Sequence, residues 1–325
     1  MLAGWYEKNG PAPEVLRVTD RPTPEPGPGE VRVRLVASAV NPSDVKARGG
    51  SRPVIPPYVI PNSDAGGIVD KVGAGVDDKR IGERVWTYNA QWQRPFGTSA
   101  QFVVLPAALA VALPAGLDFG QGACLGIPCM TAHRCLFAEG AIGGKVVLVT
   151  GGAGVVAHYA IQLAKWAGAT VVTTVSSRAK ADHAHKAGAD LIVNYRTDNV
   201  VERIRGTYGA VDQVVDVDFG DNLPLTAQVL KAHGVVASYS SMRAPTPAFP
   251  YYGLHALNPV IRPVLVYSMP DAAKIQAQED IARWVAEARP IFTIAERYPL
   301  ERIVDAHLAV ERGEKIGHVL LDIPQ

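Results

Sequence analysis

The sequence is poor in cysteine. Cys124, Cys129 and Cys135 are the only cysteines among 325 residues. Their spacing matches no common zinc motif, and an odd number cannot all be paired within one chain. We therefore expect free thiols that are mostly buried, because an unpaired cysteine usually packs as a small hydrophobic residue. The same observation favours a reducing compartment, and the cytoplasm is the predicted location.

The sequence also lacks an excess of one charge and a long apolar run. Its 32 basic and 31 acidic residues leave a formal net charge of +1. Without a basic patch, neither nucleic acid nor an anionic membrane surface is expected as a partner. Glycine and proline break the apolar segments well before the ~20 residues that span a bilayer. The first residues, MLAGWYEKNG, have neither the basic nor the apolar region of a secretory signal.

The first third of the chain has the pattern of short β-strands. Residues 30–36 alternate polar and apolar side chains, which is the period-two pattern of a half-buried strand. Similar short runs are found at 66–73, 84–88 and 99–105. Turn-rich segments such as TPEPGPGE (23–30) separate them, since proline and glycine interrupt regular structure. Many short strands of this kind predict a compact, barrel-like β domain.

From about residue 123 the pattern changes to alternating strands and helices. The predicted strands are 146–150, 170–175, 190–195, 212–217, 234–239 and 263–268. The predicted helices are 155–166, 178–187, 198–206, 222–231 and a longer amphipathic one at 271–288. Repeated β-α units of this length predict an α/β fold, with a doubly wound parallel sheet covered by helices on both faces. The last segment, 291–325, leaves this rhythm and ends in a strand-like run.

A glycine-rich turn joins the first of these strands to its helix. Residues 152–157 form a G-x-G-x-x-A variant of the dinucleotide-binding fingerprint. In this interpretation Gly152 permits the tight turn, Gly154 lets the backbone approach a pyrophosphate, and Ala157 lets helix and strand pack closely. The N–H groups at the helix N-terminus would bind the phosphates. The predicted phosphate-binding residues are Gly152, Ala153, Gly154, Val155 and Val156. The alternative is a strand, turn and helix that use glycine for geometry alone.

The residues after the second strand of this series bear on the choice of dinucleotide. Sites selective for NAD place an acid there to hold the ribose hydroxyls. The segment TTVSSRAK (173–180) has no acid but contains Ser176, Ser177, Arg178 and Lys180. The hydroxyl groups could bind a 2′-phosphate and the two cations could neutralise it, so NADPH is the predicted cofactor. In the alternative interpretation, the two cations only lie on the solvated start of a helix.

Several segments along the whole chain carry a family likeness. They are VNPSDVKARGG (40–50), PNSDAGGIVDKVG (61–73), CLGIPCMTAHRCL (124–136), GGAGVVAHYAIQLAK (151–165), AGADLIVNYR (187–196) and KIGHVLLDI (315–323). Through them the chain resembles the zinc-independent branch of the medium-chain dehydrogenase/reductase superfamily. The likeness is closest to the quinone oxidoreductases, or zeta-crystallin-like NADPH:quinone reductases. It implies a GroES-like substrate domain of residues 1–122, completed by 291–325, and a Rossmann NADP-binding domain of residues 123–290.

The resemblance also implies chemistry without a metal. Zinc-dependent members of the superfamily have a cysteine where Asn41 stands, and Gly-His-Glu where this chain has Asn62-Ser63-Asp64. Asparagine and serine are poor zinc ligands. Without zinc nothing lowers the pKa of an alcohol, whereas an electrophilic acceptor can still take a hydride from NADPH. We therefore expect reduction of quinones. Reduction of the C=C bond of α,β-unsaturated ketones or aldehydes is one alternative, and a non-catalytic cofactor-binding protein is a second.

The resemblance places further residues near the ligands. Asn41 would direct its amide to the substrate carbonyl or to the nicotinamide ribose. Thr131, at the start of the helix after GIPCM, would lie against the nicotinamide. Lys46 stands where many family members have a tyrosine, and it could pair with a cofactor phosphate. Asp44 and Asp64 are expected to fix loops by hydrogen bonds.

Other candidates lie at strand ends. Tyr88 is the first choice for a wall of the substrate pocket, because it ends a strand of the β domain. On the Rossmann side, ligands of open α/β sheets bind at the carboxyl ends of strands. The candidates there are Tyr195, Asn222, Tyr239, Ser240, Ser241 and Tyr267, which follow or end the third to sixth strands. Family members commonly pair the sixth strand across a dimer, so a homodimer through this sheet edge is expected.

Overall fold

The alternating stretch that begins at Glu30 forms the longest strand of the computed structural model, which describes residues 1–325. This strand, β3 (Glu30–Val40), buries every second side chain in its first half. Val31, Val33 and Leu35 are fully buried, as the period-two pattern requires. β3 pairs with three other strands, all antiparallel. It is therefore the centre of the β domain.

The strands around β3 form a seven-stranded sheet in the order β14-β15-β3-β4-β5-β7, with β6 also paired to β3. Their bounds are β4 Asp64–Val72, β5 Arg84–Thr87, β6 Phe102–Pro106, β7 Ala110–Ala112, β14 Ile294–Pro299 and β15 His318–Asp322. A separate two-stranded sheet consists of β1 (Leu2–Trp5) and β2 (Arg17–Asp20). The accompanying helices are α1 Ala12–Val15, α2 Pro42–Lys46, α3 Phe119–Ala123 and α11 Ile303–Arg312.

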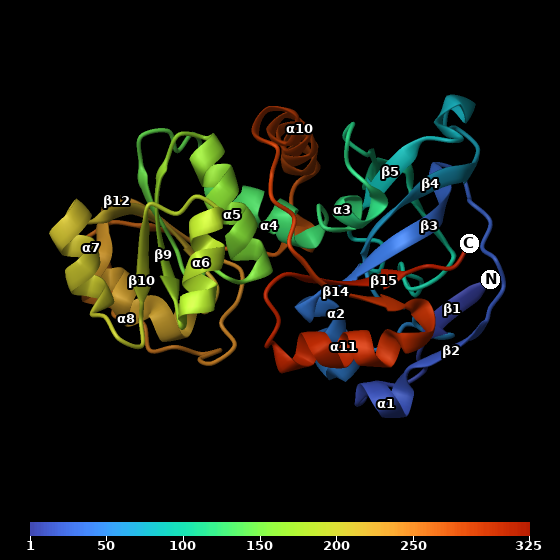
Figure 1. Ribbon diagram of the computed structural model, residues 1–325, viewed down its shortest axis with the longest axis horizontal. Coiled ribbons are helices and arrows are strands. Elements are labelled where there is room, and N and C mark those ends of the chain that lie inside the picture. The colour runs from blue at the N-terminus through green and yellow to red at the C-terminus, as the bar shows by residue number, and fades with distance from the viewer. The chain divides into compact units, whose positions relative to one another are not determined.

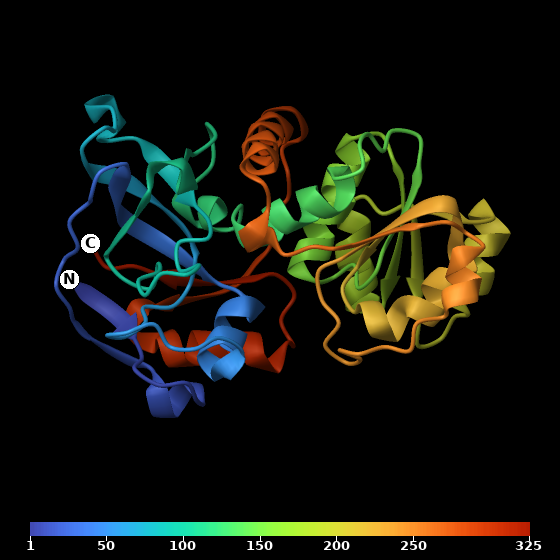
Figure 2. The ribbon, with the colours of Figure 1, turned by 180° about the vertical axis from the view of Figure 1, so that it is seen from behind.

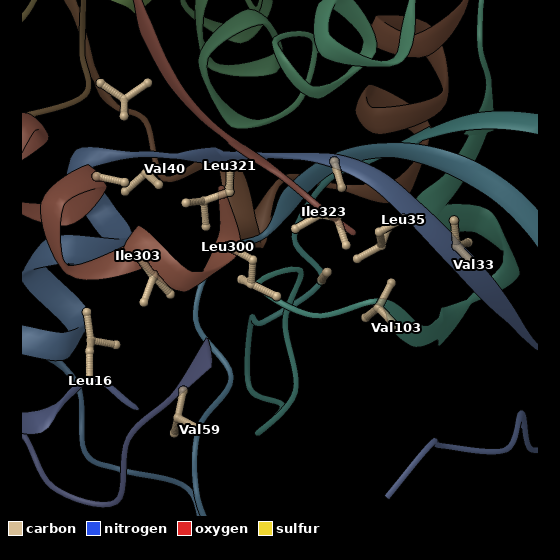
Figure 3. Close-up of a cluster of buried hydrophobic side chains, with 14 of the residues drawn as sticks. Leu16, Val33, Leu35, Val40, Val59, Val103, Leu300, Ile303, Leu321 and Ile323 are labelled. Atoms are coloured by element: carbon tan, nitrogen blue, oxygen red, sulfur yellow. The ribbon is translucent and has the colours of Figure 1, made fainter. Parts of the chain in front are cut away.

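The C-terminal segment is part of the core of this β domain. Leu300, Ile303 and Leu321 are fully buried in the same cluster as Val33 and Leu35 (Figure 3). Both ends of the chain lie in this part of the molecule (Figure 2). The side chain of Gln101 ties them together, because it accepts a hydrogen bond from the Leu2 N–H and donates one to the Pro324 carbonyl. This explains why the tail leaves the β-α rhythm.

The middle of the chain forms a six-stranded parallel sheet with the order β10-β9-β8-β11-β12-β13. The strands are β8 Val146–Val149, β9 Thr170–Val175, β10 Leu191–Asn194, β11 Val211–Asp216, β12 Leu230–Ser238 and β13 Val260–Pro263. The helices are α4 Ile127–Phe137, α5 Val155–Trp166, α6 Arg178–Lys186, α7 Val200–Tyr208, α8 Phe219–Val229, α9 Tyr251–His255 and α10 Asp271–Ala288. The predicted α/β class, with a parallel sheet in the middle of the chain and a separate β domain, is confirmed.

The strand order gives this sheet a single switch point. Chain order runs outward from β8 to β10 on one side and from β11 to β13 on the other, which is the doubly wound arrangement. Figure 1 shows α5 and α6 next to each other against the sheet. α7 and α8 pack against each other at a different place on the same sheet. Ligands of such sheets bind at the carboxyl ends of the strands next to the switch point, here β8 and β11.

The chain folds as two units. One consists of Met1–Ile127 with Phe292–Gln325 and the other of Pro128–Ile291. The division falls within α4, and the boundary expected from the sequence, between residues 122 and 123, lies inside α3.

The predicted strand 263–268 is wrong. β13 instead covers Val260–Pro263, and Val266–Ser268 is a turn of 3₁₀ helix. The reason is the length of the neighbouring strand: β12 ends at Ser238, which is opposite Pro263, so the residues that follow have no strand to pair with. The last bond in this ladder runs from the Val264 N–H to the Ser238 carbonyl.

Two expectations about composition can be compared with the structure. All three cysteines are buried and free, as predicted. Burial raises the pKa of the Cys129 and Cys135 thiols far above the usual value. None of the helices has the length and apolar character needed to span a bilayer.

A buried histidine in α11 lowers the stability of the β domain. His307 is fully buried, and neither of its ring nitrogens has a hydrogen-bond partner. Burial, and to a lesser extent the charge of Arg48, lower its pKa from 6.5 to about 3. Arg48 is itself buried, where it bonds to the Gly10 carbonyl and to Glu311. The folded protein therefore holds His307 neutral at a pH where the unfolded chain would bind a proton.

This difference predicts acid sensitivity. Between about pH 6.5 and about pH 3 only the unfolded chain protonates His307, so this residue lowers the free energy of unfolding by about 1.4 kcal/mol per pH unit as the pH falls. Above pH 6.5 this contribution disappears. We expect His307→Leu to flatten the pH dependence of urea unfolding in this window without loss of stability at pH 7, because two unpaired polar atoms leave the core. The matched control is His185→Leu in α6, where the histidine is exposed. Equal slopes in the parent and His307→Leu would contradict the assignment.

Candidate cofactor and substrate sites

The glycine turn after β8 differs in detail from its predicted geometry. Gly151 is the residue with a left-handed backbone, at φ +66°. Gly154 has an ordinary extended conformation, at φ −71° and ψ 153°. Gly152 is needed for close packing, because a Cβ there would lie 2.1 Å from the Oγ1 atom of Thr173 in β9. Gly151, and not Gly152, therefore makes the tight turn, and Gly152 must be small because it packs against β9. A motif within one segment does not reveal this contact with a neighbouring strand.

The turn leads into an uncapped helix. Gly154 is the N-cap of α5 and makes no side-chain hydrogen bond to the first turn, and it is exposed. A Cβ on Gly154 would meet only the Gly151 carbonyl, at 3.3 Å. Ala157 is fully buried, in the position where the fingerprint requires a small residue. Ala153, Val155 and Val156 are half-buried. A helix N-terminus with unsatisfied N–H groups and open space before it fits an anion such as pyrophosphate.

The polar segment after β9 is organised around the start of α6. Ser177 is the N-cap and accepts a bond from the Lys180 N–H, while Lys180 Nζ donates to Ser176 Oγ at 3.1 Å. Arg178 is 89% exposed and pairs with Asp182 at 2.8 Å, one helical turn further on. All four predicted residues therefore lie together, at the end of the strand next to the glycine turn. Tyr195, which follows β10, is also exposed.

A buried carboxylate at the switch point holds one of the predicted residues. Asn222 lies in the first turn of α8 rather than directly after β11, and its Nδ2 donates to Asp216 Oδ1 at 2.8 Å. The same oxygen accepts bonds from Thr150 Oγ1 and from the Asp218 N–H. Burial raises the pKa of Asp216, whereas these three bonds lower it. Sequence reasoning missed Asp216, although an acid at the end of an apolar strand was the available signal.

The loop after β12 is held by hydrogen bonds to β11 and α8. Tyr239 donates its N–H to the Asp216 carbonyl. Ser240 accepts from the Phe219 N–H, and Ser241 Oγ accepts from the Gly220 N–H at 3.0 Å. The Ser241 hydroxyl then donates to the Ala244 carbonyl. The predicted trio thus lies at the carboxyl edge of the sheet, where the Ser240 carbonyl and the Ser241 hydroxyl already have partners.

Two predicted positions need correction. Thr131 is the fifth residue of α4 and not at its start, because the helix begins at Ile127. Tyr267 does not end the sixth strand but lies in the 3₁₀ turn after it. Both side chains are buried, Thr131 at 5% and Tyr267 at 7% exposure.

Asn41 is held by two buried acids of the β domain. Its Nδ2 atom donates to Asp64 Oδ2 at 2.7 Å, and its backbone N–H donates to Asp44 Oδ2 at 2.8 Å. Asp64 Oδ2 also accepts from the Ile127 N–H at 2.8 Å. Both acids fix loops by hydrogen bonds, as predicted. Burial raises the pKa of Asp44 to about 7, and burial together with the charge of Asp44 raises that of Asp64 well above its usual range.

The other β-domain candidates differ in their exposure. Tyr88 directly follows β5 and is only 1% exposed, with its ring 5.6 Å from that of Trp86. Lys46 is the last residue of α2 and is exposed. An exposed cation can reach a ligand phosphate, whereas a fully buried ring can act only through the packing of its neighbours.

Comparisons with known proteins agree with this architecture. Residues 27–115 match the alcohol dehydrogenase GroES-like domain model, and residues 155–284 match the zinc-binding dehydrogenase model. The chain is 31% identical to a 2-haloacrylate reductase of a Burkholderia species, over 92% of each chain. It is 31% identical to a mouse quinone oxidoreductase, over 95% of this chain and 94% of the other.

Solved structures give the same result. The chain is similar to the Escherichia coli quinone oxidoreductase complexed with NADPH, with a TM-score of 0.83, 28% identity, and 99% and 100% of the two chains covered. It is also similar to a protein described as an NAD-dependent alcohol dehydrogenase, with a TM-score of 0.89, 29% identity and full coverage of both. The chain belongs to the quinone oxidoreductase family of the medium-chain dehydrogenases/reductases. It is an oxidoreductase, and the predicted family is confirmed.

Membership in the quinone oxidoreductase family gives a context for the residues around Asn41. The position that carries a zinc-binding cysteine in zinc-dependent members holds the Asn41 amide, and this amide bonds to Asp64. Ser63 donates no side-chain bond in the structure but accepts one from the Gln91 N–H. No three His, Cys, Asp or Glu side chains gather in a geometry that could hold a metal ion.

The two glycines of the fingerprint, Gly152 and Gly154, should differ in how much stability the protein loses when each is given a methyl group. Gly152→Ala places a methyl 2.1 Å from Thr173 Oγ1, so β9 or the turn must move, at a cost of about 1–3 kcal/mol. Gly154→Ala places it 3.3 Å from one carbonyl in an allowed conformation, so we expect almost no change. Thermal unfolding of the two variants without cofactor measures both. A lower melting temperature for Gly154→Ala than for Gly152→Ala would show that the turn is built differently.

Proposed function

We propose that this protein is an NADPH-dependent reductase of quinones that works without a metal. The observation that carries the proposal is the combination, at adjacent strand ends, of an uncapped helix N-terminus after Gly151–Gly154 and an acid-free polar segment after β9. The first fits a pyrophosphate and the second fits a 2′-phosphate. The relative solved with NADPH supports the choice of cofactor, whereas the one described as NAD-dependent makes a direct test necessary.

In this proposal the middle of the chain binds the cofactor. Residues 123–290 form the NADP-binding domain, and residues 1–122 with 291–325 form the substrate domain. Gly152, Ala153, Gly154, Val155 and Val156 hold the pyrophosphate through backbone N–H groups. Ser176, Ser177, Arg178 and Lys180 hold the 2′-phosphate, with Lys46 as a further cation. Tyr195, Asn222, Tyr239, Ser240, Ser241 and Tyr267 line the remainder of the cofactor site.

The chemical step needs alignment more than activation. NADPH supplies the hydride when bound, and a quinone accepts it without a Lewis acid. Asn41 orients the substrate carbonyl or the nicotinamide ribose through its amide, and Thr131 packs against the nicotinamide. Tyr88 supports the pocket from its buried position. Because Asn41 and Ser63 replace zinc-binding residue types, we propose that turnover is independent of metal ions.

Reduction of an activated C=C bond is the second candidate. The relative named 2-haloacrylate reductase favours it, because an acrylate carries a C=C bond conjugated to a carboxylate. Such a reaction also needs a proton for the α-carbon, whereas a reduced quinone takes protons readily from water. The two candidates share cofactor and scaffold, and they differ in the acceptor.

We also propose a cytoplasmic homodimer. β13 is an edge strand of the parallel sheet and pairs only with β12. Val260 is 41% exposed on this edge, and Leu265, just beyond it, is 53% exposed. An open edge with exposed apolar residues is a natural site for a second copy of the same strand.

Cofactor preference is the first test. We expect a smaller dissociation constant for NADPH than for NADH, measured by quenching of tryptophan fluorescence. Arg178→Ala should weaken NADPH binding by about tenfold and leave NADH binding unchanged, since the lost partner is a charge-assisted bond to the 2′-phosphate. Arg203→Ala on α7, with the same change of charge at another exposed position, is the matched control. Gly154→Val separates the phosphate turn from the 2′-phosphate site, because it should weaken both cofactors equally. Equal constants for the two cofactors in the parent protein would refute the assignment to NADPH.

Acceptor preference is the second test. We expect steady-state oxidation of NADPH to be faster with 1,4-benzoquinone or 1,4-naphthoquinone than with an α,β-unsaturated ketone, an alkenal or a 2-haloacrylate. Dialysis against a chelator should leave the rate unchanged. Faster turnover with the C=C acceptors would favour the second candidate function, and loss of turnover together with bound zinc would refute metal independence.

A further inference from the structure

A single carboxylate oxygen joins two parts of the β-domain unit that are far apart in sequence. Asp64, the first residue of β4, is fully buried. Its Oδ2 atom accepts one bond from Asn41 Nδ2 at 2.7 Å and another from the Ile127 N–H at 2.8 Å. Its other oxygen, Oδ1, is buried without a partner. The two bonds therefore converge on one atom, and both depend on where that atom is held.

A glycine allows the backbone to lie against this carboxylate. A Cβ on Gly126 would lie 2.2 Å from both Cγ and Oδ1 of Asp64, so the backbone before α4 lies directly against the acid. The next residue, Ile127, is the first of the 11 residues of α4, and its N–H points at Asp64 Oδ2. An acid at this position satisfies a free N–H of the helix and interacts favourably with the helix dipole. Thr131 lies one turn further along the same helix.

The bond to Asn41 determines which end of the amide faces a ligand. The nitrogen of the amide faces Asp64, whose Oδ2 atom accepts its bond together with that of the Ile127 N–H. The amide oxygen, Oδ1, lies on the opposite side, where it accepts the Asp44 N–H in a capping box. An amide oxygen has two lone pairs, so one remains for a hydroxyl group of a ligand. Asp64 therefore holds the nitrogen end of the amide, and the backbone of the α2 turn holds the oxygen end.

We propose that Asp64 is a positioning residue for the reductase: it orients the Asn41 amide so that its oxygen accepts a hydrogen bond from a hydroxyl of the ligand, and it fixes the first turn of the helix that carries Thr131. The proposal rests on the role of Asn41 in the proposed function. Its ligand group is a ribose hydroxyl of the nicotinamide half or a hydroxyl of the reduced substrate. Asp64 itself touches neither.

Asp44 provides a matched control, because it supports the same turn in a different way. Its carboxylate accepts the backbone N–H of Asn41 and is 1% exposed. Asp44→Asn disturbs the turn and its stability, but it leaves the bond between the Asn41 side chain and Asp64 in place. A role of Asp64 limited to stability would make Asp64 and Asp44 variants equivalent.

The experiment compares Asp64→Ala, Asp64→Asn, Asn41→Ala, the double variant Asn41→Ala/Asp64→Ala, and Asp44→Asn. We expect Asp64→Ala to lower kcat/KM by about 10- to 100-fold, the range for a misplaced positioning group. Asp64→Asn keeps an oxygen that can accept both bonds, so it should recover most of this loss. In the Asn41→Ala background, removal of Asp64 should cost less than about threefold more, because two residues that act through one interaction are not additive.

A spectroscopic measurement tests the same bond without turnover. The side-chain ¹⁵N–¹H₂ signals of Asn41 can be assigned by their absence in Asn41→Ala. Asp64→Ala should shift the hydrogen-bonded proton of this pair upfield, and Asp44→Asn should leave it in place. The dissociation constant for NADPH, measured on the same variants, reports whether the cofactor hydroxyl is the partner of Asn41.

The outcomes are distinguishable. Equal, multiplicative losses for Asp64→Ala in both backgrounds, or an unmoved Asn41 signal, would overturn the proposal. Asn41→Ala with parental kinetics and NADPH affinity would overturn it as well, while turnover of quinones by the parent would still support the function. If the parent reduces no acceptor, the proposed function fails, but the shift of the Asn41 signal and the NADPH affinities still decide the role of Asp64. Should Asp64→Ala fail to fold, Asp64→Leu, which has a side chain of similar shape and no acceptor, takes its place beside Asp64→Asn and Asp44→Asn.

Discussion

The parallel sheet of the middle unit imposes one constraint on everything around it: its strands all end at the same edge. The glycine turn, the Ser-Arg-Lys segment and the loop after β12 are distant in sequence, and this edge brings them together. The contact between Gly152 and Thr173 sets how closely the turn approaches β9. A side chain at residue 152 would push the start of α5 away from the strand whose end carries Ser176. The proposed dinucleotide site therefore depends on the absence of a side chain at residue 152.

Buried carboxylates hold the ends of several helices and strands in place by hydrogen bonds. Asp216 accepts bonds from three donors: Thr150 directly after β8, Asp218 after β11, and Asn222 in α8. Asp64 accepts bonds from two donors, Asn41 at the N-cap of α2 and Ile127 at the start of α4. In both cases burial raises the pKa and the donors counteract it. An acid with several N–H donors can be held in the interior, because hydrogen bonds replace the water that it loses. Among the candidate residues, these two acids fix the side-chain amides of Asn222 and Asn41.

The sequence predicts those features that depend on local pattern. α5, α10 and β9 have the predicted bounds. α10 shows a helical period along one buried face, whereas β9 and most of α5 are continuous buried runs bounded by turn residues. The prediction of a strand at 263–268 was wrong because the end of β12, 25 residues earlier at Ser238, decides where β13 stops. Residue types at strand ends were also visible, but their hydrogen-bond partners were not. Asn222 is held by Asp216, and the Ser241 hydroxyl is held by Gly220, 21 residues away. Pairings of this kind follow from the fold and leave no periodic signal.

The tail that completes the β domain has a consequence for the order of folding. Leu300, Ile303 and Leu321 occupy the core beside Val33 and Leu35, whereas the Rossmann unit is one uninterrupted stretch, Pro128–Ile291. During synthesis the ribosome completes that stretch before it makes the last part of the β-domain core. The half of the protein that begins first is thus finished last. The apolar side chains that pack against the tail, Val33 and Leu35 among them, stay uncovered during that interval, when a nascent chain is most open to aggregation and to chaperones.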